Sequence, residues 1–251
     1  MVDPDFDETS PFPETADIQT SNDDYATRFK GKTGAWMLEM QERGVLSLLR
    51  GCGAVKNGAT VLDVGGGHGQ LAHPLVREGY AVTVIGSSPS CRHRIRDLVD
   101  AGTCEFKVGN VIDLPYPDKS FDAVVAVRML THCSVWPQLV KEMCRVSRGP
   151  VITDYPTSQS LNAVAPALFK AKKKFEKNTR TWTLFRHREV MDAFAAAGFA
   201  KTGRFAQFFL PMVVHRALKC RALSAFLEGC CRLVGLTSLW GTPVIIRMER
   251  R

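Results

Sequence analysis

The chain has 251 residues, of which 45% are apolar and 23% are charged, and this composition excludes a collagenous, coiled-coil or wholly disordered protein. The run nearest to a membrane span, Phe205 to Val214, is shorter than the roughly 18 apolar residues that a spanning helix needs. The eight cysteines form no C-x-x-C pair, so we expect reduced thiols rather than disulfides or a metal site. The length favours one domain.

Charge is divided unevenly along the chain. Residues 1–24 carry eight acids and neither lysine nor arginine, which predicts a disordered acidic tail. This start lacks the basic and apolar regions of a secretory signal and favours a cytoplasmic protein. Residues 160–251 carry 17 basic and five acidic side chains, so we expect an anionic partner: a substrate, a lipid headgroup surface or RNA. A solvated basic face is the alternative.

Apolar periodicity predicts helices and strands in alternation. Met37, Met40, Gly44 and Leu48 recur at helical spacing over about 34–49. Strands are expected over 60–64, 81–85, 105–108, 121–127 and 150–155, with helices after several of them, notably over 135–146 and 187–197. Two further strand-like runs, 203–213 and 242–248, flank an amphipathic helical segment with Leu223, Phe226, Leu227, Cys230 and Val234. This alternation predicts an α/β fold with a doubly wound parallel sheet.

The first strand, 60–64, leads directly into the glycine loop Gly65-Gly66-Gly67-His68-Gly69 and then into a helix. Bare backbone at such a position presents free N–H groups to an anionic ligand group. A dinucleotide loop has the spacing G-x-G-x-x-G, whereas the third glycine here comes one position early. The loop therefore disfavours an NAD-dependent dehydrogenase.

Three segments resemble motifs of the class I S-adenosylmethionine (SAM)-dependent methyltransferases. VLDVGGGHG (61–69) is similar to the first motif, GNVIDLPYPDKSFDAVVAV (109–127) to the segment before and in the fourth strand, and KEMCRVSRGPVI (141–152) to the one before the fifth. Their order and spacing resemble the UbiE-like (methyltransferase type 11) branch. The resemblance implies a Rossmann-like, seven-stranded, mostly parallel sheet with an antiparallel last strand and a helical insertion between the last two strands.

The same resemblance implies one methyltransferase domain over 25–251. Residues 157–241 would contribute a variable substrate lid. Five aromatic residues in or beside this segment are expected to line the lid: Tyr155, Trp182, Phe185, Phe208 and Phe209.

By the same resemblance, SAM is the cofactor. The positions that match its site are Tyr25, Arg28, Asp63, Gly65, Gly66, Gly67, His68, Gly69, Gly86, Ser87, Asn110, Val111, Arg128 and Met129. Asp63 would help hold the cofactor's amino group, and Asn110 with Val111 would meet the adenine edge. Arg128 would pair with the SAM carboxylate or an anionic substrate, or form a structural ion pair. We interpret His68 as loop filler rather than a chemical group.

The main departure from the family is Gly86, where most members carry an acid that accepts hydrogen bonds from both ribose hydroxyls. Ser87 or Ser88 could offer only a neutral hydroxyl, which predicts cofactor binding weaker by about 1 kcal/mol. His132 matches a family histidine and is a candidate general base if the nucleophile is a hydroxyl. A packing or capping role is its alternative.

These features predict a SAM-dependent methyltransferase acting by in-line displacement on a small or lipid-like acceptor that is anionic or aromatic. The basic C-terminal segment predicts contact with a membrane surface. Two alternatives remain open: an RNA-modifying methyltransferase, in which the basic segment follows phosphates, and an inactive methyltransferase-like binding subunit, suggested by Gly86.

Overall fold

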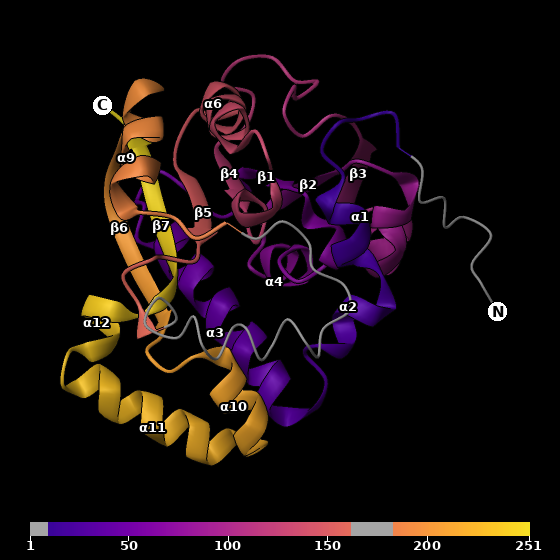
Figure 1. Cartoon of the computed structure of the whole chain (residues 1–251). Helices are drawn as coiled ribbons and strands as arrows, with labels where there is room; N and C mark the ends of the chain where they lie inside the picture. Colours follow the sequence, from indigo (N-terminus) through magenta and orange to yellow (C-terminus); the bar gives the residue numbers. More distant parts are fainter. Residues whose placement is uncertain (1–9, 162–182) are drawn as a thin grey trace.

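The computed structural model describes residues 10–161 and 183–251, which share one mixed β-sheet (Figure 1). Its seven strands lie in the order β3-β2-β1-β4-β5-β7-β6. Their bounds are β1 (Thr60–Val64), β2 (Ala81–Gly86), β3 (Cys104–Val108), β4 (Ala123–Ala126), β5 (Val151–Tyr155), β6 (Phe199–Phe208) and β7 (Thr242–Arg250). The first five strands pair in parallel, and β7 runs antiparallel between β5 and β6. The predicted mostly parallel sheet with an antiparallel last strand is confirmed.

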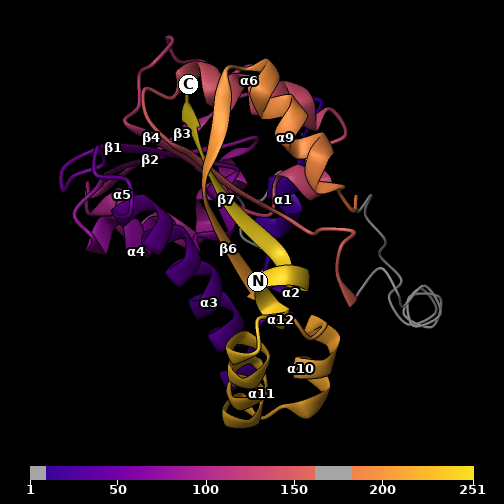
Figure 2. The same cartoon turned by 90° about the vertical axis from the view of Figure 1, so that its left-hand side faces the viewer.

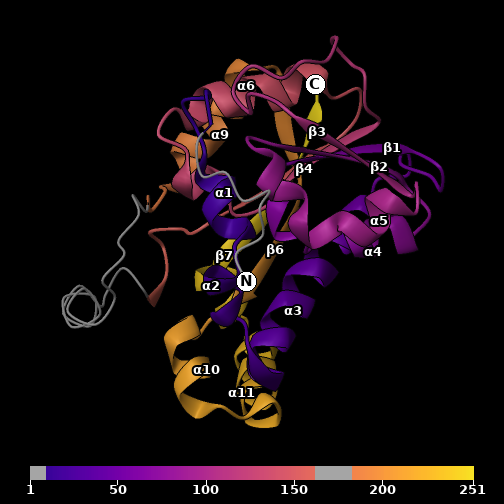
Figure 3. The same ribbon diagram turned by 90° about the vertical axis from the view of Figure 1, so that its right-hand side faces the viewer.

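Helices cover both faces of this sheet (Figures 2 and 3). On one face lie α6 (Trp136–Val146) and α9 (His187–Ala196); on the other lie α3 (Gly31–Arg50), α4 (Ala72–Arg77) and α5 (Arg96–Asp100). Since β1 has β2 on one side and β4 on the other, the strand order reverses there, and the carboxyl ends of β1, β2 and β4 form the crevice in which such sheets bind ligands.

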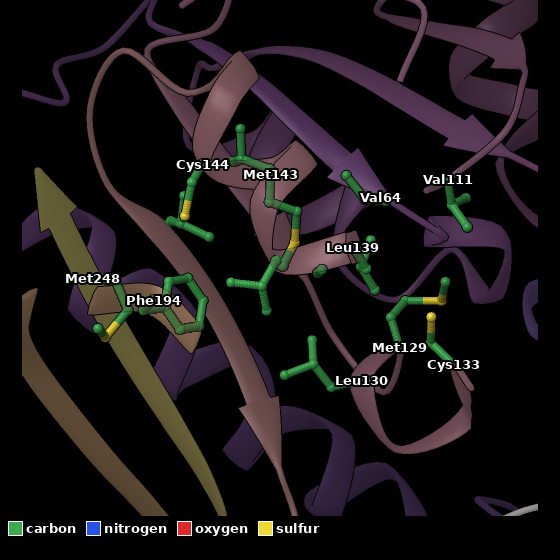
Figure 4. Close-up of a cluster of buried hydrophobic side chains, with 14 of the residues drawn as sticks. Val64, Val111, Met129, Leu130, Cys133, Leu139, Met143, Cys144, Phe194 and Met248 are labelled. Carbon is green, nitrogen blue, oxygen red and sulfur yellow. The ribbon is translucent and has the colours of Figure 1, made fainter. Parts of the chain in front are cut away.

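The core under α6 and α9 is apolar. Leu139, Met143 and Cys144 of α6 lie among Phe194 of α9 and Met248 of β7, and all five side chains are almost completely buried (Figure 4). Burial of such side chains contributes about 1.5–3 kcal/mol each. This layer holds α6 and α9 against the sheet.

Helix α3 confirms the predicted periodicity, and its glycine has a packing reason. A Cβ added to Gly44 would lie 2.6 Å from Ile245 Cδ1 and 2.7 Å from a ring carbon of Phe205. Glycine therefore lets α3 lie close to β6 and β7.

Strand β6 differs from its predicted range of 203–213, since it spans Phe199–Phe208. Gly198, with φ +80, ends the preceding helical turn and lets the strand begin earlier. Pro211 cannot donate to a strand ladder, and the chain turns there into α10 (Met212–Leu218).

Three helices form a lobe after β6, at the carboxyl edge of β4 and β5 (Figure 1). They are α10, α11 (Arg221–Leu233) and α12 (Leu236–Trp240). The Phe208 ring packs 5.2 Å from Trp36 of α3 and 5.5 Å from His215, which joins this lobe to α3. None of the helices within 10–161 and 183–251 has both the length and the apolar content of a membrane span.

The aromatic lid was predicted wrongly for three of its members. Tyr155, Phe185 and Phe208 are core residues with at most 1% of their surface exposed, so they cannot line an open lid. Phe209 is half-buried, and Trp182 lies outside the described residues. Aromatic composition did not distinguish a lid from a core because both favour these residue types.

The prediction of a disordered tail over 1–24 is also wrong where the structure describes it. Residues 16–21 form helix α1 (Ala16–Ser21), and α2 (Asp23–Thr27) follows. Ile18 is 4% exposed and Asp17 is fully buried. The tail packs because its acids find hydrogen-bond donors on the sheet's carboxyl edge, which composition alone does not reveal.

Candidate cofactor site

The glycine loop after β1 requires its glycines. Gly65 and Gly69 have φ values of +70 and +71, the left-handed conformation that favours glycine. A Cβ on Gly65 would lie 2.2 Å from Met129 Sδ, and one on Gly66 would lie 2.4 Å from Asp63 Oδ2. The loop contains a single turn of 3₁₀-helix, η1 (Gly66–His68).

Asp63 lies in β1 beneath Gly66 and is 2% exposed. Burial raises the pKa of its carboxyl to about 7, and the nearby charge of Arg128 opposes that rise. A cationic group entering here would favour the ionised form. Asp63 therefore suits an ammonium group, and its role in holding the cofactor stays a prediction.

Arg128 follows β4 and is held in an uncommon backbone conformation with φ +60. Its N–H donates to Asp154 Oδ1 at 2.6 Å, and its Nη2 donates to Gln70 Oε1. Its Nη1 is buried and has no hydrogen-bond partner. A buried guanidinium nitrogen without an acceptor is costly, so this atom fits a carboxylate that arrives with a ligand.

His68 packs between aromatic rings. Its ring lies 5.5 Å from Tyr25 and 5.7 Å from Phe29, edge-on to both. Burial, with Arg128 and Arg94 nearby, lowers the pKa of His68 to about 3. The imidazole is neutral at physiological pH and has no hydrogen-bond partner on either nitrogen, which agrees with a packing role rather than acid–base chemistry.

Tyr25 and Phe29 join this cluster from the N-terminal segment. The Arg128 guanidinium lies over Phe29 at 5.1 Å and over Tyr25 at 5.7 Å. Arg28 is exposed and lies over Tyr25 at 5.1 Å, so it supports the ring from the solvent side.

A small cavity lies between the glycine loop and Arg128. Its lining combines one acid, one base and bare glycine backbone. The lining residues are Asp63, Gly65, Gly66, His68, Gln70, Leu71, Val127 and Arg128. This charge pair matches the ammonium and carboxylate of an amino acid.

The loop after β2 has no space for an acidic side chain at Gly86, the position where most family members bind the ribose. A Cβ on Gly86 would lie 2.6 Å from Cys91 Cβ in η2 (Pro89–Ile95), so any side chain there would displace η2. Ser87 donates from its N–H to Asp17 Oδ2 at 2.6 Å and from its hydroxyl to Asp17 Oδ1. The sequence analysis did not identify Asp17 as a partner of this loop. The apolar Ile18 beside it was the one sign that this acidic segment packs against the domain.

The remaining predicted positions lie near the ends of β3 and β4. Asn110 Oδ1 accepts from Ile112 N at 3.2 Å, so this oxygen holds its own turn. The side chains of Val111 and Met129 are buried in the core, and Met129 covers Gly65 (Figure 4). His132 ends η3 (Leu130–His132) and is half-buried; its role as a base stays a prediction.

Residues 62–149 match the family model described as a methyltransferase domain. The magnesium protoporphyrin IX methyltransferase ChlM of Synechocystis, solved with bound S-adenosylhomocysteine (SAH), superposes with a TM-score of 0.62 at 13% identity and covers 93% of this chain and 97% of that one. The fold is that of the class I SAM-dependent methyltransferases. SAM is the cofactor that these comparisons support, and the charge pair at Asp63 and Arg128 fits its amino-acid end.

The curated proteins that this chain resembles are methyltransferases, and their sequence identity to the chain is modest. Methyltransferase GfsG of Streptomyces halstedii is 34% identical over 45% of this chain and 44% of its own. The 2-methyl-6-phytyl-1,4-hydroquinone methyltransferase of Synechocystis is 29% identical over 60% and 44%, and the phosphatidylethanolamine N-methyltransferase of Cereibacter sphaeroides is 34% identical over 50% and 63%. The matches span 44% of the length of each of the first two relatives.

Proposed function

We propose that the protein transfers the methyl group of SAM to a lipid-like acceptor presented at a membrane surface. Support for the transfer comes from the glycine loop, the Asp63–Arg128 pair and the match over 62–149. The outer face of the α10–α12 lobe is the observation that supports a lipid-like acceptor.

In this proposal the cofactor's amino-acid end lies in the cavity beside the glycine loop. Asp63 holds the ammonium group, Arg128 Nη1 donates to the carboxylate, and the rings of Tyr25 and Phe29 keep water from the pair. When bound, SAM supplies an activated methyl group. Held by Asp63 and Arg128, SAM would give this methyl group in line to the acceptor's nucleophile and would leave as a neutral thioether.

Such a displacement needs alignment more than acid–base chemistry. Holding two reacting groups in line is worth about 7–11 kcal/mol in well-oriented systems. A hydroxyl acceptor must also lose its proton, and His132 is the residue that we propose as its base. A quinone-type carbon acceptor, as in the UbiE-like branch, is one member of the proposed acceptor class.

Helix α11 is amphipathic in the reverse of the usual sense. Its polar residues Ser224 and Glu228 are buried, and Glu228 accepts from Phe209 N at 2.9 Å and Leu210 N at 2.8 Å. Glu228 also pairs with the buried His215 at 3.0 Å. The helix therefore uses its polar stripe to hold the lobe together and turns its apolar stripe outward.

The outward stripe is large. Phe226 is 67% exposed, Leu233 89% and Val234 71%, and Leu239 and Trp240 of α12 are exposed as well. Within the part of the chain that the structure describes, no element packs over these side chains. Exposed apolar surface of this kind marks an interaction site.

The charge of the lobe favours an anionic membrane over a neutral one. The only acid between 212 and 240 is the buried Glu228, and Lys219, Arg221 and Arg232 are exposed. Arg221 also pairs with Glu39 at 2.8 Å, and Arg232 Nη2 donates to the carbonyl oxygen of Gln207 at 3.0 Å. Apolar residues flanked by cations are typical of helices that lie in the lipid interface, where each cation contributes about 1 kcal/mol on anionic lipid. Two relatives are named for a phytylated hydroquinone and a phosphatidylethanolamine, which supports the same class.

Vesicle sedimentation tests the membrane part of this proposal. Full-length protein should sediment with phosphatidylglycerol–phosphatidylcholine vesicles and not with pure phosphatidylcholine at physiological salt. The double variant Phe226→Asp and Leu233→Asp should lose this binding by tenfold or more, because two charges would enter the interface at about 1–2 kcal/mol each. Val108→Asp, which alters an exposed valine at the opposite end of the sheet, is the matched control.

Transfer itself is measured with [methyl-³H]SAM. Label should enter the organic phase of a lipid extract, and more so when the extract is in anionic vesicles. Label found only in tRNA would favour the RNA-modifying alternative. No label in any acceptor, together with tight SAH binding, would favour the inactive binding subunit.

A further inference from the structure

The strap formed by residues 10–22 places a carboxylate at the carboxyl end of β2. Asp17 Oδ2 accepts from Ser87 N at 2.6 Å and from Cys91 Sγ at 3.5 Å. Asp17 Oδ1 accepts from the Ser87 hydroxyl and from Ile18 N at 3.1 Å. The Ser10 hydroxyl also donates to Ser87 O at 2.7 Å. The N–H, the hydroxyl and the carbonyl oxygen of Ser87 are thus all hydrogen-bonded to the chain's own N-terminal segment.

Asp17 has no acceptor capacity left. An ionised carboxylate offers about four lone-pair sites, and four donors occupy them here. Asp17, Ser87 and Cys91 are all 0% exposed. A ligand hydroxyl cannot reach either Asp17 or Ser87 unless α1 moves.

A second acid fixes the strap at the beginning of α6. Glu14 Oε1 accepts from Ser134 N at 2.8 Å and Val135 N at 3.2 Å, and from the Ser134 hydroxyl. This contact lies away from the loop after β2. Releasing it would loosen the strap without touching any donor at Ser87.

Between these anchors α1 lies on the glycine loop. A Cβ on Gly67 would lie 3.1 Å from Ser21 Cβ and 3.3 Å from Asp17 O. The strap therefore covers the loop on its β2 side, whereas Met129 covers Gly65 on the β4 side.

A cofactor with its amino-acid end at Asp63 and Arg128 must extend its nucleoside past the glycine loop. The β4 side is closed by the core residue Met129, so the nucleoside runs toward β2. There, the N–H and hydroxyl of Ser87 are the donors it meets. These are the two groups that Asp17 now occupies.

We propose that α1 is an internal occupant of the nucleoside end of the cleft, and that cofactor and Asp17 compete for Ser87. Binding then requires the strap to leave, and the measured affinity equals the intrinsic affinity reduced by the fraction of molecules with the strap undocked. The proposal rests on the proposed function only in placing the cofactor at this cleft.

Calorimetric titration of the full chain with SAH tests the competition. Asp17→Ala and Glu14→Ala should each bind SAH more tightly than the wild type, by about tenfold, because each removes charge-assisted bonds that hold the docked state. Asp113→Asn, an exposed acid outside the strap, should leave the affinity unchanged. Thermal unfolding of each variant shows that the fold is retained.

Hydrogen exchange supplies a second readout on the wild type. SAH should speed amide exchange over residues 16–21 while slowing it over 65–69. If Asp17 instead holds the ribose, Asp17→Ala will weaken binding, Glu14→Ala will be neutral and residues 16–21 will become protected; that pattern overturns the proposal. If all variants bind SAH with equal affinity, the competition between α1 and the cofactor is overturned and the proposed function stands. If no variant binds SAH, the proposed function is overturned as well.

Discussion

The two ends of the candidate cofactor cleft differ in how their polar groups are satisfied. At the amino-acid end, Arg128 Nη1 is buried without an acceptor and Asp63 is buried with a raised pKa. At the nucleoside end, the donors of Ser87 are fully used by Asp17. One end therefore gains from a ligand, and the other must give up internal hydrogen bonds to accept it. Affinity is the balance of these two ends.

The largest effect is expected from the glycine loop. Gly65→Ala combines a left-handed φ with a contact of 2.2 Å to Met129 Sδ, which should cost about 1–3 kcal/mol of stability and lower SAH affinity by on the order of 100-fold. Gly58→Ala is the matched control, because Gly58 has φ +82 with open space around it. Equal SAH affinity in both variants would remove the loop from the site.

The unpaired guanidinium nitrogen gives the next effect. Arg128→Gln should weaken SAH binding by about 10- to 100-fold, the usual contribution of a hydrogen bond between charged groups. 5′-Methylthioadenosine lacks the amino-acid end, so its affinity should change little. Calorimetry with both ligands separates the two ends of the cleft, and an equal loss for both would mean that Arg128 acts only on folding.

Asp63 predicts a pH dependence of binding. With its pKa raised to about 7, the carboxyl is largely protonated below that pH in the free protein, and a ligand ammonium favours its ionised form. SAH affinity should therefore rise about tenfold from pH 6 to pH 8, with proton release. In Asp63→Asn this rise should disappear; if it persists, another group carries it.

The smallest effect is expected at His68. The pKa of His68 is lowered to about 3, so the folded protein holds a neutral ring, whereas the unfolded chain takes up a proton near pH 6.5. The contribution of the neutral ring to the free energy of unfolding is therefore complete above pH 6.5 and is lost as the pH falls toward 3. His68→Phe should retain the ring packing, change SAH affinity by less than about threefold, and flatten this acid loss of stability. Urea unfolding between pH 4 and pH 8 measures it; a large loss of transfer activity would instead mark His68 as chemical.

The same contrast between the two ends explains what sequence reasoning could predict. The glycine loop, Asp63 and Arg128 sit on contiguous strand-to-loop segments, and their conformations follow from local φ requirements and strand order. Asp17 reaches Ser87 across 70 residues, and only docking of α1 brings the two together. From composition alone, a carboxylate in an acidic segment is predicted to be solvated. Only the structure shows the buried donors that it meets.

The α10–α12 lobe shows the same limit in another form. Apolar spacing in α11 predicted an amphipathic helix, and the helix is present. The spacing did not indicate which stripe faces inward. That choice follows from Glu228, which finds two backbone N–H groups and His215 inside the lobe and so draws the polar stripe inward.

The central claim is that the cleft at β1 and β2 binds a sulfonium nucleoside through its amino-acid end. Calorimetric titration of the full-length wild type with SAH, repeated in the presence of saturating NAD, tests it most directly. We predict saturable one-to-one binding of SAH that NAD does not alter. Binding of NAD without measurable binding of SAH would contradict the account.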